Sequence, residues 1–496
     1  MTPTLPDEPG APTARGYSVR GLFNRAALYS FSDVALKSIG FFLIPIYTRV
    51  LTPSDYGIVA FCQATVQMIS PLIGFGLISA LPILYYAYED EQRRRLVSSI
   101  INFVLLSGLV MTLALTLFSE PVFDSVAGDV PFSPFVVLAL LISYSTALEF
   151  IPLNILNMQD RAGRYTLYSL GLGLLSVGLT LLLVVALDLG AEGALYATLM
   201  ATTAGMVGAG FVVRGLWKPM IDRSILRETF AVALPALPHA FSSAFLRFAD
   251  RIFLVGGTTL AITGVYSLAV TFSSVALLVL GGITTALNPL FYRRANADDE
   301  TLPGDWARIT SLFGLAAAMV GLSIALLGGE AIRVLTPESY HGAIDILPLL
   351  VLGQLFTAAY WLFSPPIGYR RKMWTYPASS FPGVATAIGL NILLIPVFEG
   401  TGAALALAGS ALVQAAIFGW FSQRYYPIPY EKRRLATLAL LTAACFAVGY
   451  TVDDPLGLSV AVKLATIAAL PAALAAAGFF DPGELTPVRR LLRLPS

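Results

Sequence analysis

Long apolar segments, separated by short polar ones, follow one another along almost the whole chain. A helix needs about 17 to 25 predominantly apolar residues to cross a bilayer, and about fourteen segments are near or above that length. They cover residues 26–50, 56–85, 96–118, 133–157, 165–187, 192–214, 229–255, 262–291, 308–328, 343–366, 374–397, 402–422, 434–451 and 457–479. The pattern predicts an all-α membrane protein with about fourteen transmembrane helices.

The seventh apolar segment carries polar side chains along one face. At about 100° per residue, their spacing places them within about a third of the helix circumference. They are His239, Ser243, Arg247, Asp250 and Arg251. A charge inside a spanning helix costs at least about 2.5 to 3.5 kcal/mol on insertion scales, so charged side chains usually face protein or water. We therefore expect this face to border an interior of the molecule.

The region around the eighth segment repeats the region around the second without a gap. A shift of 207 positions superposes two glycines, a proline and a tyrosine, and glycine and proline hold backbone conformations that other residues adopt poorly. The matched pairs are Gly57 with Gly264, Gly74 with Gly281, Pro82 with Pro289, and Tyr85 with Tyr292. The helix that precedes the first copy also carries a polar stripe, which includes Asp33 and Lys37.

This repeat predicts two six-helix lobes. Because six helices separate the copies, both copies start from the same side of the membrane, and the pseudo-two-fold axis of this parallel repeat runs along the membrane normal. The predicted units are an N-terminal tail (1–25), an N-terminal lobe (26–217), a linker (218–228), a C-terminal lobe (229–424), two additional transmembrane helices (425–480) and a C-terminal tail (481–496).

Composition supports an integral membrane protein. Of the 496 residues, 56% are hydrophobic and 12% are charged, and the mean hydropathy is +0.75; soluble domains contain about 25% charged residues. The two cysteines and two histidines form no cluster with metal-ligand spacing, so we expect neither a metal nor a cofactor. No loop is long enough for a catalytic domain, and no nucleic-acid partner is expected. The protein is predicted not to be an enzyme.

The charge pattern predicts the orientation. If the N-terminus is cytoplasmic, the cytoplasmic segments hold 25 of the 31 Lys and Arg residues, whereas the external segments hold only Arg49 and Arg333. The remaining four, Lys37, Arg247, Arg251 and Lys463, fall inside predicted spans. By the positive-inside rule, this asymmetry supports the helix count and predicts that both termini are cytoplasmic.

Three stretches carry a resemblance to a known family. They are YTRVLTPSDYGIVAF in the first half, then FADRIFL with TGVYSLAV, and finally GLNILLIPVFEGTGAALALAGSALVQ. Over about residues 22–480 the chain resembles the polysaccharide biosynthesis proteins. These are bacterial flippases of lipid-linked oligosaccharides in the multidrug/oligosaccharidyl-lipid/polysaccharide exporter superfamily. The resemblance implies two lobes in a V, two further helices, and a central cavity that opens alternately to each side.

The resemblance also implies a function and a location. The expected substrate is an oligosaccharide linked to undecaprenyl diphosphate, moved from the cytoplasmic to the periplasmic leaflet of the bacterial inner membrane for cell-surface polysaccharide biosynthesis. The expected partners, besides the bilayer itself, are a polysaccharide polymerase and glycosyltransferases of the same pathway. Basic residues that line the cavity would meet the diphosphate.

Three basic residues are candidates for that contact, namely Lys37, Arg247 and Arg251. A diphosphate needs desolvated cationic donors; arginine offers a planar fork and lysine a point charge. The alternative is structural: Asp33, four residues before Lys37, forms an internal pair with it, and Asp250 neutralises Arg247 or Arg251.

Two further charged residues stand alone in their predicted helices. Glu149 in the fourth helix and Lys463 in the fourteenth either border the cavity, take part in ion coupling, or pair with a neighbouring helix. The intramembrane charges are four basic and three acidic, a bias of one charge toward an anionic substrate. A multidrug or cation antiporter on the same scaffold is the main alternative function. A membrane-embedded glycosyl- or acyltransferase is a weaker one, because no catalytic constellation is present.

Overall fold

The computed structural model describes residues 41, 43–451 and 456–480, and within them it contains helices and no strand. The first part consists of α2 (Ile44–Val50), α3 (Pro53–Ile73), α4 (Leu77–Ala87), α5 (Asp90–Phe118), α6 (Glu120–Ala127), α7 (Val137–Met158, preceded by the π-helical segment η1, Phe132–Val136), α8 (Ala162–Thr180, continued by the π-helical segment η2, Leu181–Ala186) and α9 (Gly190–Val213). The second part consists of α10 (Arg223–Gly257), α11 (Leu260–Asn296), α12 (Leu302–Leu335), η3 (Glu338–Tyr340), α13 (Ala343–Leu362), α14 (Ser364–Tyr369), α15 (Thr375–Tyr425), α16 (Lys432–Tyr450) and α17 (Leu456–Ala476).

Twelve helices of the described part are long and apolar enough to cross a membrane, which confirms the all-α membrane fold. One of them, the 51-residue α15, contains two of the expected segments, which meet at Glu399, where φ is 50°. The first expected segment, 26–50, lies mostly outside the described residues. The total of fourteen spans, the parallel repeat and the domain limits therefore stay predictions.

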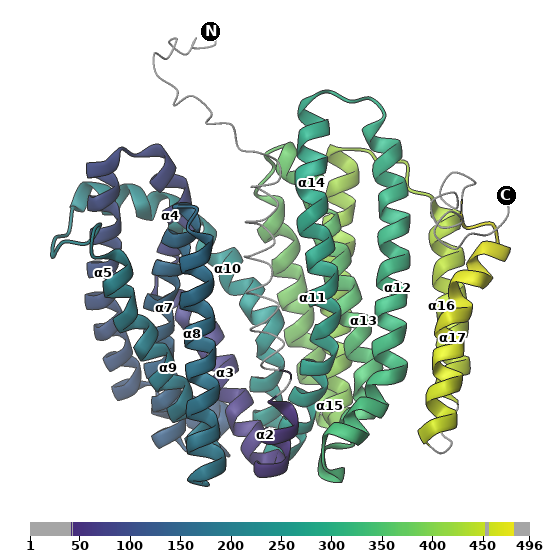
Figure 1. Ribbon diagram of the computed structural model, residues 1–496, viewed down its shortest axis with the longest axis horizontal. Coiled ribbons are helices and arrows are strands. Elements are labelled where there is room, and N and C mark those ends of the chain that lie inside the picture. Colours follow the sequence, from purple (N-terminus) through teal and green to yellow (C-terminus); the bar gives the residue numbers. More distant parts are fainter. Residues whose placement is uncertain (1–40, 42, 452–455, 481–496) are drawn as a thin grey trace.

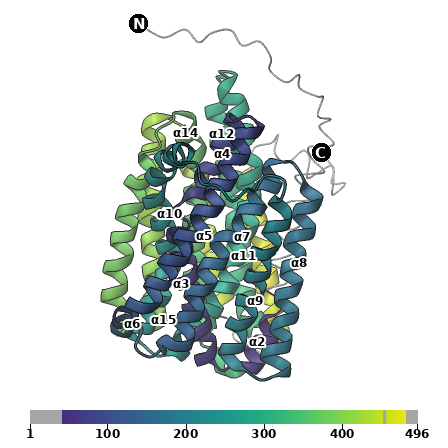
Figure 2. The same cartoon turned by 90° about the vertical axis from the view of Figure 1, so that its left-hand side faces the viewer.

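The helices form two groups and an outlying pair (Figure 1). Helices α3 to α9 make the first group, which we call the N-lobe, and α10 to α15 make the second, which we call the C-lobe. The pair α16 and α17 packs on α12 through Leu438, Leu470 and Leu474, which contact Leu322 and Leu326. Figure 2 places α4 and α14 at one end of the molecule and α2 and α6 at the other.

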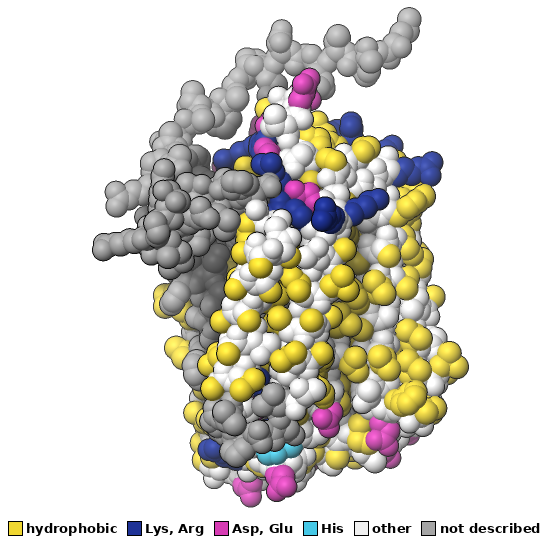
Figure 3. All heavy atoms as spheres, turned by 90° about the vertical axis from the view of Figure 1, so that its right-hand side faces the viewer, with side chains coloured by type: hydrophobic (Ala, Val, Ile, Leu, Met, Phe, Trp, Pro, Cys, Tyr) yellow, Lys and Arg dark blue, Asp and Glu magenta, His cyan; other side chains and the backbone are white. Residues whose placement is uncertain are grey.

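Charged side chains gather at the two ends, and the face between them is largely hydrophobic (Figure 3). Lys and Arg are concentrated at one end, which we call the basic end. It holds the helix ends near which Arg93, Arg294, Arg424 and Lys432 lie, and the connection that carries Arg370. The opposite end holds the connections around α6 and η3. Apolar side chains are exposed on the midsection, and Leu440, for example, is 72% exposed. Such exposure is expected where the surroundings are lipid rather than water.

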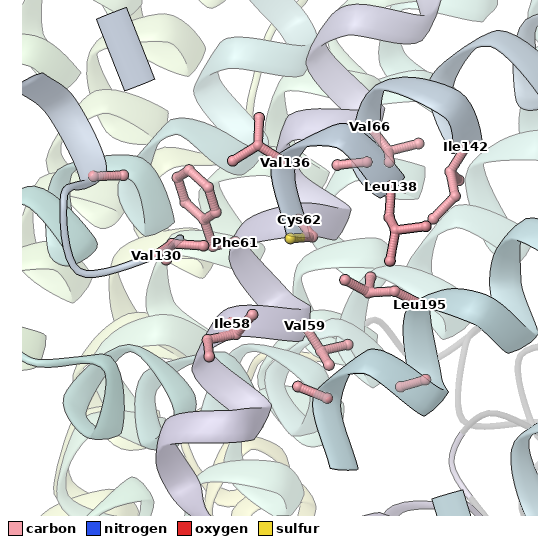
Figure 4. Packing of buried hydrophobic residues seen from close by; sticks show 14 of the residues in the cluster. Ile58, Val59, Phe61, Cys62, Val66, Val130, Val136, Leu138, Ile142 and Leu195 are labelled. Carbon is pink, nitrogen blue, oxygen red and sulfur yellow. The ribbon is translucent and has the colours of Figure 1, made fainter. Parts of the chain in front are cut away.

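The N-lobe core forms around α3. Its side chains from Ile58 to Val66 interdigitate with residues of η1, α7 and α9 around the buried Cys62 (Figure 4). At its start, the Thr52 hydroxyl accepts a hydrogen bond from the Asp55 N–H, while Asp55 accepts one from the Thr52 N–H. This reciprocal capping box satisfies backbone donors that the first helical turn leaves unpaired. It fixes the point at which the chain turns into the bundle.

The two lobes meet where α3 crosses α11, near the opposite end. A Cβ on Gly57 would overlap the carbonyl oxygen of Leu260, and a Cβ on Gly264 would overlap that of Pro53. Only glycine allows the two backbones to approach so closely. The contact is reciprocal at a spacing of 207 residues, which is the arrangement that a two-fold axis between the helices would produce.

A second tie between the lobes lies at the same end. The Tyr340 hydroxyl of η3 donates a hydrogen bond of 2.9 Å to the backbone oxygen of Leu51, and the rings of Tyr56 and Tyr340 meet edge to face. Toward the basic end, α4 and α5 lie farther from α11 and α13, and α10 packs against α4 and α5 between the two groups (Figure 1). The contacts between the lobes near α2 and η3 thus hold that end together.

Candidate functional site

Arg247 is the one intramembrane candidate on α10 whose side chain is exposed. Its guanidinium makes no hydrogen bond and no ion pair with any other described residue. It precedes the end of the helix at Gly257 by ten residues, which is about 15 Å at 1.5 Å per residue. An unpaired guanidinium at that depth is free to bind an anion from an aqueous space.

Arg251 and Asp250 form a buried pair instead. Arg251 Nη1 lies 2.8 Å from Asp250 Oδ1, and the two residues are 8% and 5% exposed. The Tyr266 hydroxyl of α11 donates to the other carboxylate oxygen of Asp250. Arg251 also donates to the backbone oxygen of Arg247. Because both charges are paired and hydrogen-bonded, this cluster joins α10 to α11 rather than presenting a free cation.

His239 lies on the side of α10 that faces α15. Its Nδ1 is 3.4 Å from the Ser380 hydroxyl, and its ring meets that of Tyr376 edge to face at 5.4 Å between centroids. The polar face expected from the sequence is thus divided between two environments. His239 and the Asp250 pair contact neighbouring helices, and Arg247 remains exposed.

Glu149 lies inside the N-lobe between α7, α8 and α9. Its side chain packs against Gly205, where an added Cβ would be 2.8 Å from Glu149 Cγ. The Tyr168 hydroxyl donates a hydrogen bond to the backbone oxygen of Gly205. Nearby, the hydroxyls of Ser145 and Thr203 are 3.3 Å apart. Among the described residues no basic side chain pairs with Glu149, and the surrounding hydroxyls make this a polar region within an apolar lobe.

Lys463 is far from these residues in the fold, at the contact of α17 with α12. Its Nζ lies 2.6 Å from Glu330 Oε1, which also accepts a hydrogen bond of 2.9 Å from the Ser459 hydroxyl. Lys463 is 8% exposed and Glu330 is 5% exposed. The pair fastens the outlying helices to the C-lobe. Of the three interpretations open for Lys463, pairing with a neighbouring helix is the arrangement present here.

The remaining sequence candidates, Asp33 and Lys37, lie outside the described residues. Whether Lys37 contacts the diphosphate or pairs with Asp33 therefore stays a prediction. Sequence reasoning did not single out Glu330 or Tyr266. Glu330 fell in the expected external loop 329–342, whereas α12 continues to Leu335 and buries it. One sequence signal could have found Glu330. If the expected segment 308–328 is extended by about two helical turns, it carries the Glu330 carboxylate to the depth of Lys463, the lysine of α17.

Comparisons with known proteins agree on the fold. The sequence model of the family described as "Polysaccharide biosynthesis protein" matches residues 23–294, more than half of the chain. A lipid II flippase MurJ in an inward closed conformation superposes with a TM-score of 0.73 at 14% identity, over 92% of this chain and 100% of that chain. No curated protein matches the sequence significantly.

Multidrug transporters are similar as well. An inward-facing MATE family transporter of the MOP superfamily gives a TM-score of 0.57 at 17% identity, over 83% of this chain and 96% of that chain. A variant of the Vibrio cholerae MATE transporter VcmN gives 0.57 at 17%, over 82% and 95%. At such identities the likeness is one of fold, and that fold is shared by flippases and exporters.

Proposed function

We propose, from the premise that this chain belongs to the polysaccharide biosynthesis protein family, that it is a flippase of undecaprenyl-diphosphate-linked oligosaccharide. It moves the glycan from the cytoplasmic to the periplasmic leaflet by alternating access, for assembly of a cell-surface polysaccharide. It does so in the bacterial inner membrane with both termini in the cytoplasm. A polymerase and glycosyltransferases of the same pathway are its partners.

The exposed, unpaired guanidinium of Arg247 is the observation that carries the proposal. A diphosphate head group bears charges that must leave water during transport, and a guanidinium fork offers two parallel hydrogen bonds to its oxygens. The neighbouring Arg251 is neutralised by Asp250 and supports the helix without competing for the anion. Among the described intramembrane candidates, Arg247 is thus the cation left to meet an anionic substrate.

The orientation rests on the basic end. Cytoplasmic loops carry an excess of Lys and Arg, so the end that holds Arg93, Arg370 and Lys432 is the cytoplasmic one. In that orientation the lobes are fastened together on the periplasmic side, at Gly57 with Gly264 and at Tyr340. Toward the cytoplasm α10 also contacts the N-lobe, where Phe230 meets the rings of Phe75 and Phe103 and the Tyr88 hydroxyl donates to Glu228.

The test is export of glycan by Arg247 variants. Loss of a charge-assisted hydrogen bond costs about 1.5 to 3 kcal/mol, so we expect Arg247→Ala to reduce export about 10- to 100-fold. Arg247→Lys retains the charge without the fork and restores part of the activity. Arg161→Ala, which removes an exposed arginine at the N-cap of α8, is the matched control and exports normally.

Membrane abundance of each variant is measured in parallel. Normal export by an abundant Arg247→Ala protein would remove this residue from the substrate path. Disappearance of the protein from the membrane would instead assign Arg247 a structural role.

A cation-coupled multidrug antiporter is the alternative, and Glu149 is the observation that favours it. A carboxylate among hydroxyls inside a lobe is suited to binding a proton or a cation. Efflux of a cationic dye by wild type, abolished by Glu149→Gln and unaffected by Arg247→Ala, would favour the antiporter. Glycan export that depends on Arg247, together with no efflux of the dye, favours the flippase.

A further inference from the structure

A second polar site lies at the basic end of the C-lobe, where α11 ends and α14 leads into α15. It is a cavity of about 490 Å³. Its lining consists of Tyr292, Asn296, Gly368, Tyr369, Arg370 and Arg371. The Tyr292 hydroxyl lies directly against Gly368, so a Cβ at residue 368 would collide with it. The volume is enough for a phosphate-sized group with its water.

The two arginines of this cavity are not neutralised. Both are exposed, and neither forms an ion pair with any described residue. The Arg370 guanidinium instead lies over the rings of Tyr369 and Tyr426, 5.6 Å from each centroid. Stacking on aromatic faces orients the guanidinium while leaving its N–H donors available for an anion.

Two of the acidic residues after the end of α11 have a basic partner of their own. Asp299 accepts a hydrogen bond of 2.7 Å from Arg294 Nε, and Asp305 accepts one of 2.6 Å from Arg294 Nη2. The hydrogen bonds from Arg294 and Thr301 lower the pKa of Asp299 to about 2, so it stays ionised and bound to Arg294 at neutral pH. Both of these carboxylates are therefore engaged by Arg294 rather than by Arg370 or Arg371.

Arg371 occupies a backbone conformation that arginine rarely adopts. Its φ is 53°, in the left-handed region, where Gly, Asn and Asp are enriched. The Arg371 N–H donates to Gly368 O at 3.0 Å, and the Lys372 N–H donates to Ile367 O at 3.3 Å. The connection after α7 has the same pair of bonds, with Asp160 at the left-handed position. A strained arginine in place of the preferred residue points to a role for its side chain.

Two exposed side chains, one apolar and one aromatic, follow the arginines closely in the chain. Met373 is 58% exposed and Trp374 is 53% exposed, after the intervening Lys372. Tryptophan at the end of a spanning helix typically marks the head-group level of a bilayer. An anion that reaches this cavity is consequently at the depth of lipid head groups.

We propose that this cavity binds the phosphate group of a lipid, held by Arg370 and Arg371. Two lipids carry that chemistry at this depth, namely a diphosphate-linked substrate that waits to enter the lobes and an anionic phospholipid of the bilayer. In the described part of the N-lobe, the corresponding turn has different contacts. At the corresponding turn Gln159 Nε2 donates to the Tyr85 hydroxyl, and Arg93, which lies over that ring, is paired with Asp90.

The test is lipid binding to the purified full-length protein, measured by native mass spectrometry, and it requires no transport. Undecaprenyl diphosphate and phosphatidylglycerol are titrated separately, with phosphatidylcholine as the lipid without net charge. We expect both anionic lipids to bind more tightly than phosphatidylcholine. Arg370→Gln with Arg371→Gln should weaken both at least about tenfold, since each charge-assisted bond contributes about 1.5 to 3 kcal/mol.

Two variants separate binding from folding. Arg371→Gly removes the side chain and relieves the left-handed backbone, so it should weaken binding while the thermal midpoint stays the same or rises. Arg424→Gln, which removes an exposed arginine stacked on Trp420 outside the cavity, should bind like wild type.

The relative affinities of the two anionic lipids identify the source. Tighter binding of undecaprenyl diphosphate assigns the cavity to the substrate, and tighter binding of phosphatidylglycerol assigns it to the bilayer. Equal binding of all three lipids, or unchanged binding in both Arg371→Gly and the double variant, would overturn the proposal. Because the readout is binding, loss of export in Arg247 variants has no bearing on it.

Discussion

Helix α3 of the N-lobe and helix α11 of the C-lobe begin in the same way and end differently. Thr52 caps α3 and Thr259 caps α11, at the same spacing of 207 residues that relates the crossing glycines. Beyond that crossing, α3 stops at Ile73 and the chain turns through Phe75 and Gly76, at φ of 49° and 65°, before α4 begins. In the C-lobe, α11 continues without a break from Leu260 to Asn296.

The turn between α3 and α4 lies against a proline-containing stretch of α10. Gly76 packs against Ala233 and Leu237 of α10, in the stretch that contains Pro235 and Pro238. Proline removes a helical hydrogen bond and permits a kink, so two weakened segments are in contact. We infer that the N-lobe bends here while the C-lobe moves as a more rigid unit. Identical rigid lobes would need no such asymmetry.

The lobes also differ in how they hold an intramembrane acid. Glu149 in the N-lobe has no basic partner among the described residues, whereas Glu330 in the C-lobe is paired with Lys463. The N-lobe carboxylate thus lacks a counter-charge among the described residues, and the C-lobe carboxylate joins α17 to α12.

The largest expected effect tests that difference in pairing. Glu330→Gln leaves the Lys463 charge buried without a counter-charge, and breaking a buried pair costs about 3 to 5 kcal/mol. We expect this variant to lower the unfolding midpoint in detergent sharply. Glu149→Gln should change it little. The double change Glu330→Gln with Lys463→Met should recover most of the loss, because no buried charge then remains.

Equal destabilisation by Glu330→Gln and Glu149→Gln would erase this distinction between the lobes. Failure of the double variant to recover would show that the pair contributes through packing rather than charge.

The next largest effect concerns the contact between Gly57 of α3 and Gly264 of α11. Gly57→Ala and Gly264→Ala each place a methyl group against a backbone carbonyl that has no rotamer to change, and overpacking costs about 1 to 3 kcal/mol. If the contact is two-fold related, both variants should lose similar stability and similar export. Gly389→Ala in α15, where an added Cβ meets nothing within 4 Å, is the control. A large effect at one glycine and none at the other would contradict the equivalence.

The fold was predictable where burial in lipid sets the pattern. Apolar length alone identified the helices, because a bilayer imposes that length on every span. The break inside the expected segment 56–85 was not predicted, since the left-handed conformation of Phe75 follows from packing on α10 and leaves no apolar signal. The kink of α15 at Glu399 fell between two expected segments, and the pattern placed it correctly.

The candidate site was predictable in its charges and not in their pairing. Local spacing suggested that Asp250 neutralises an arginine, and it does so for Arg251. The partners of Lys463 and Asp250 on other helices, Glu330 and Tyr266, depend on how the helices pack. Likewise, nothing in the sequence marked Arg371 as left-handed, because its conformation comes from the turn around it.

The smallest expected effect sharpens the comparison of the second helices. Gly76→Ala adds a Cβ at a φ of 65°, 3.3 Å from Leu237 Cδ1 and 3.5 Å from Ala233 O, and a left-handed non-glycine residue costs about 1 to 2 kcal/mol. Gly282→Ala is the matched control in the unbroken α11, where nothing lies within 4 Å and alanine is the better helix former by about 1 kcal/mol. We expect the first variant to lose about 1 kcal/mol of stability and the second to keep or gain it.

The rate of glycan export distinguishes a hinge at residue 76 from a fixed turn that the added Cβ only strains. If the break absorbs motion, Gly76→Ala should lower the rate of glycan export by more than its loss of stability explains, because the open and closed states need different backbone angles at residue 76. Cooling should enlarge the deficit, since a stiffer segment raises the barrier to the conformational step. Gly282→Ala should export normally. Export by Gly76→Ala that falls only in proportion to protein abundance would show that the turn is a fixed corner, and that the two lobes move alike despite their different helices.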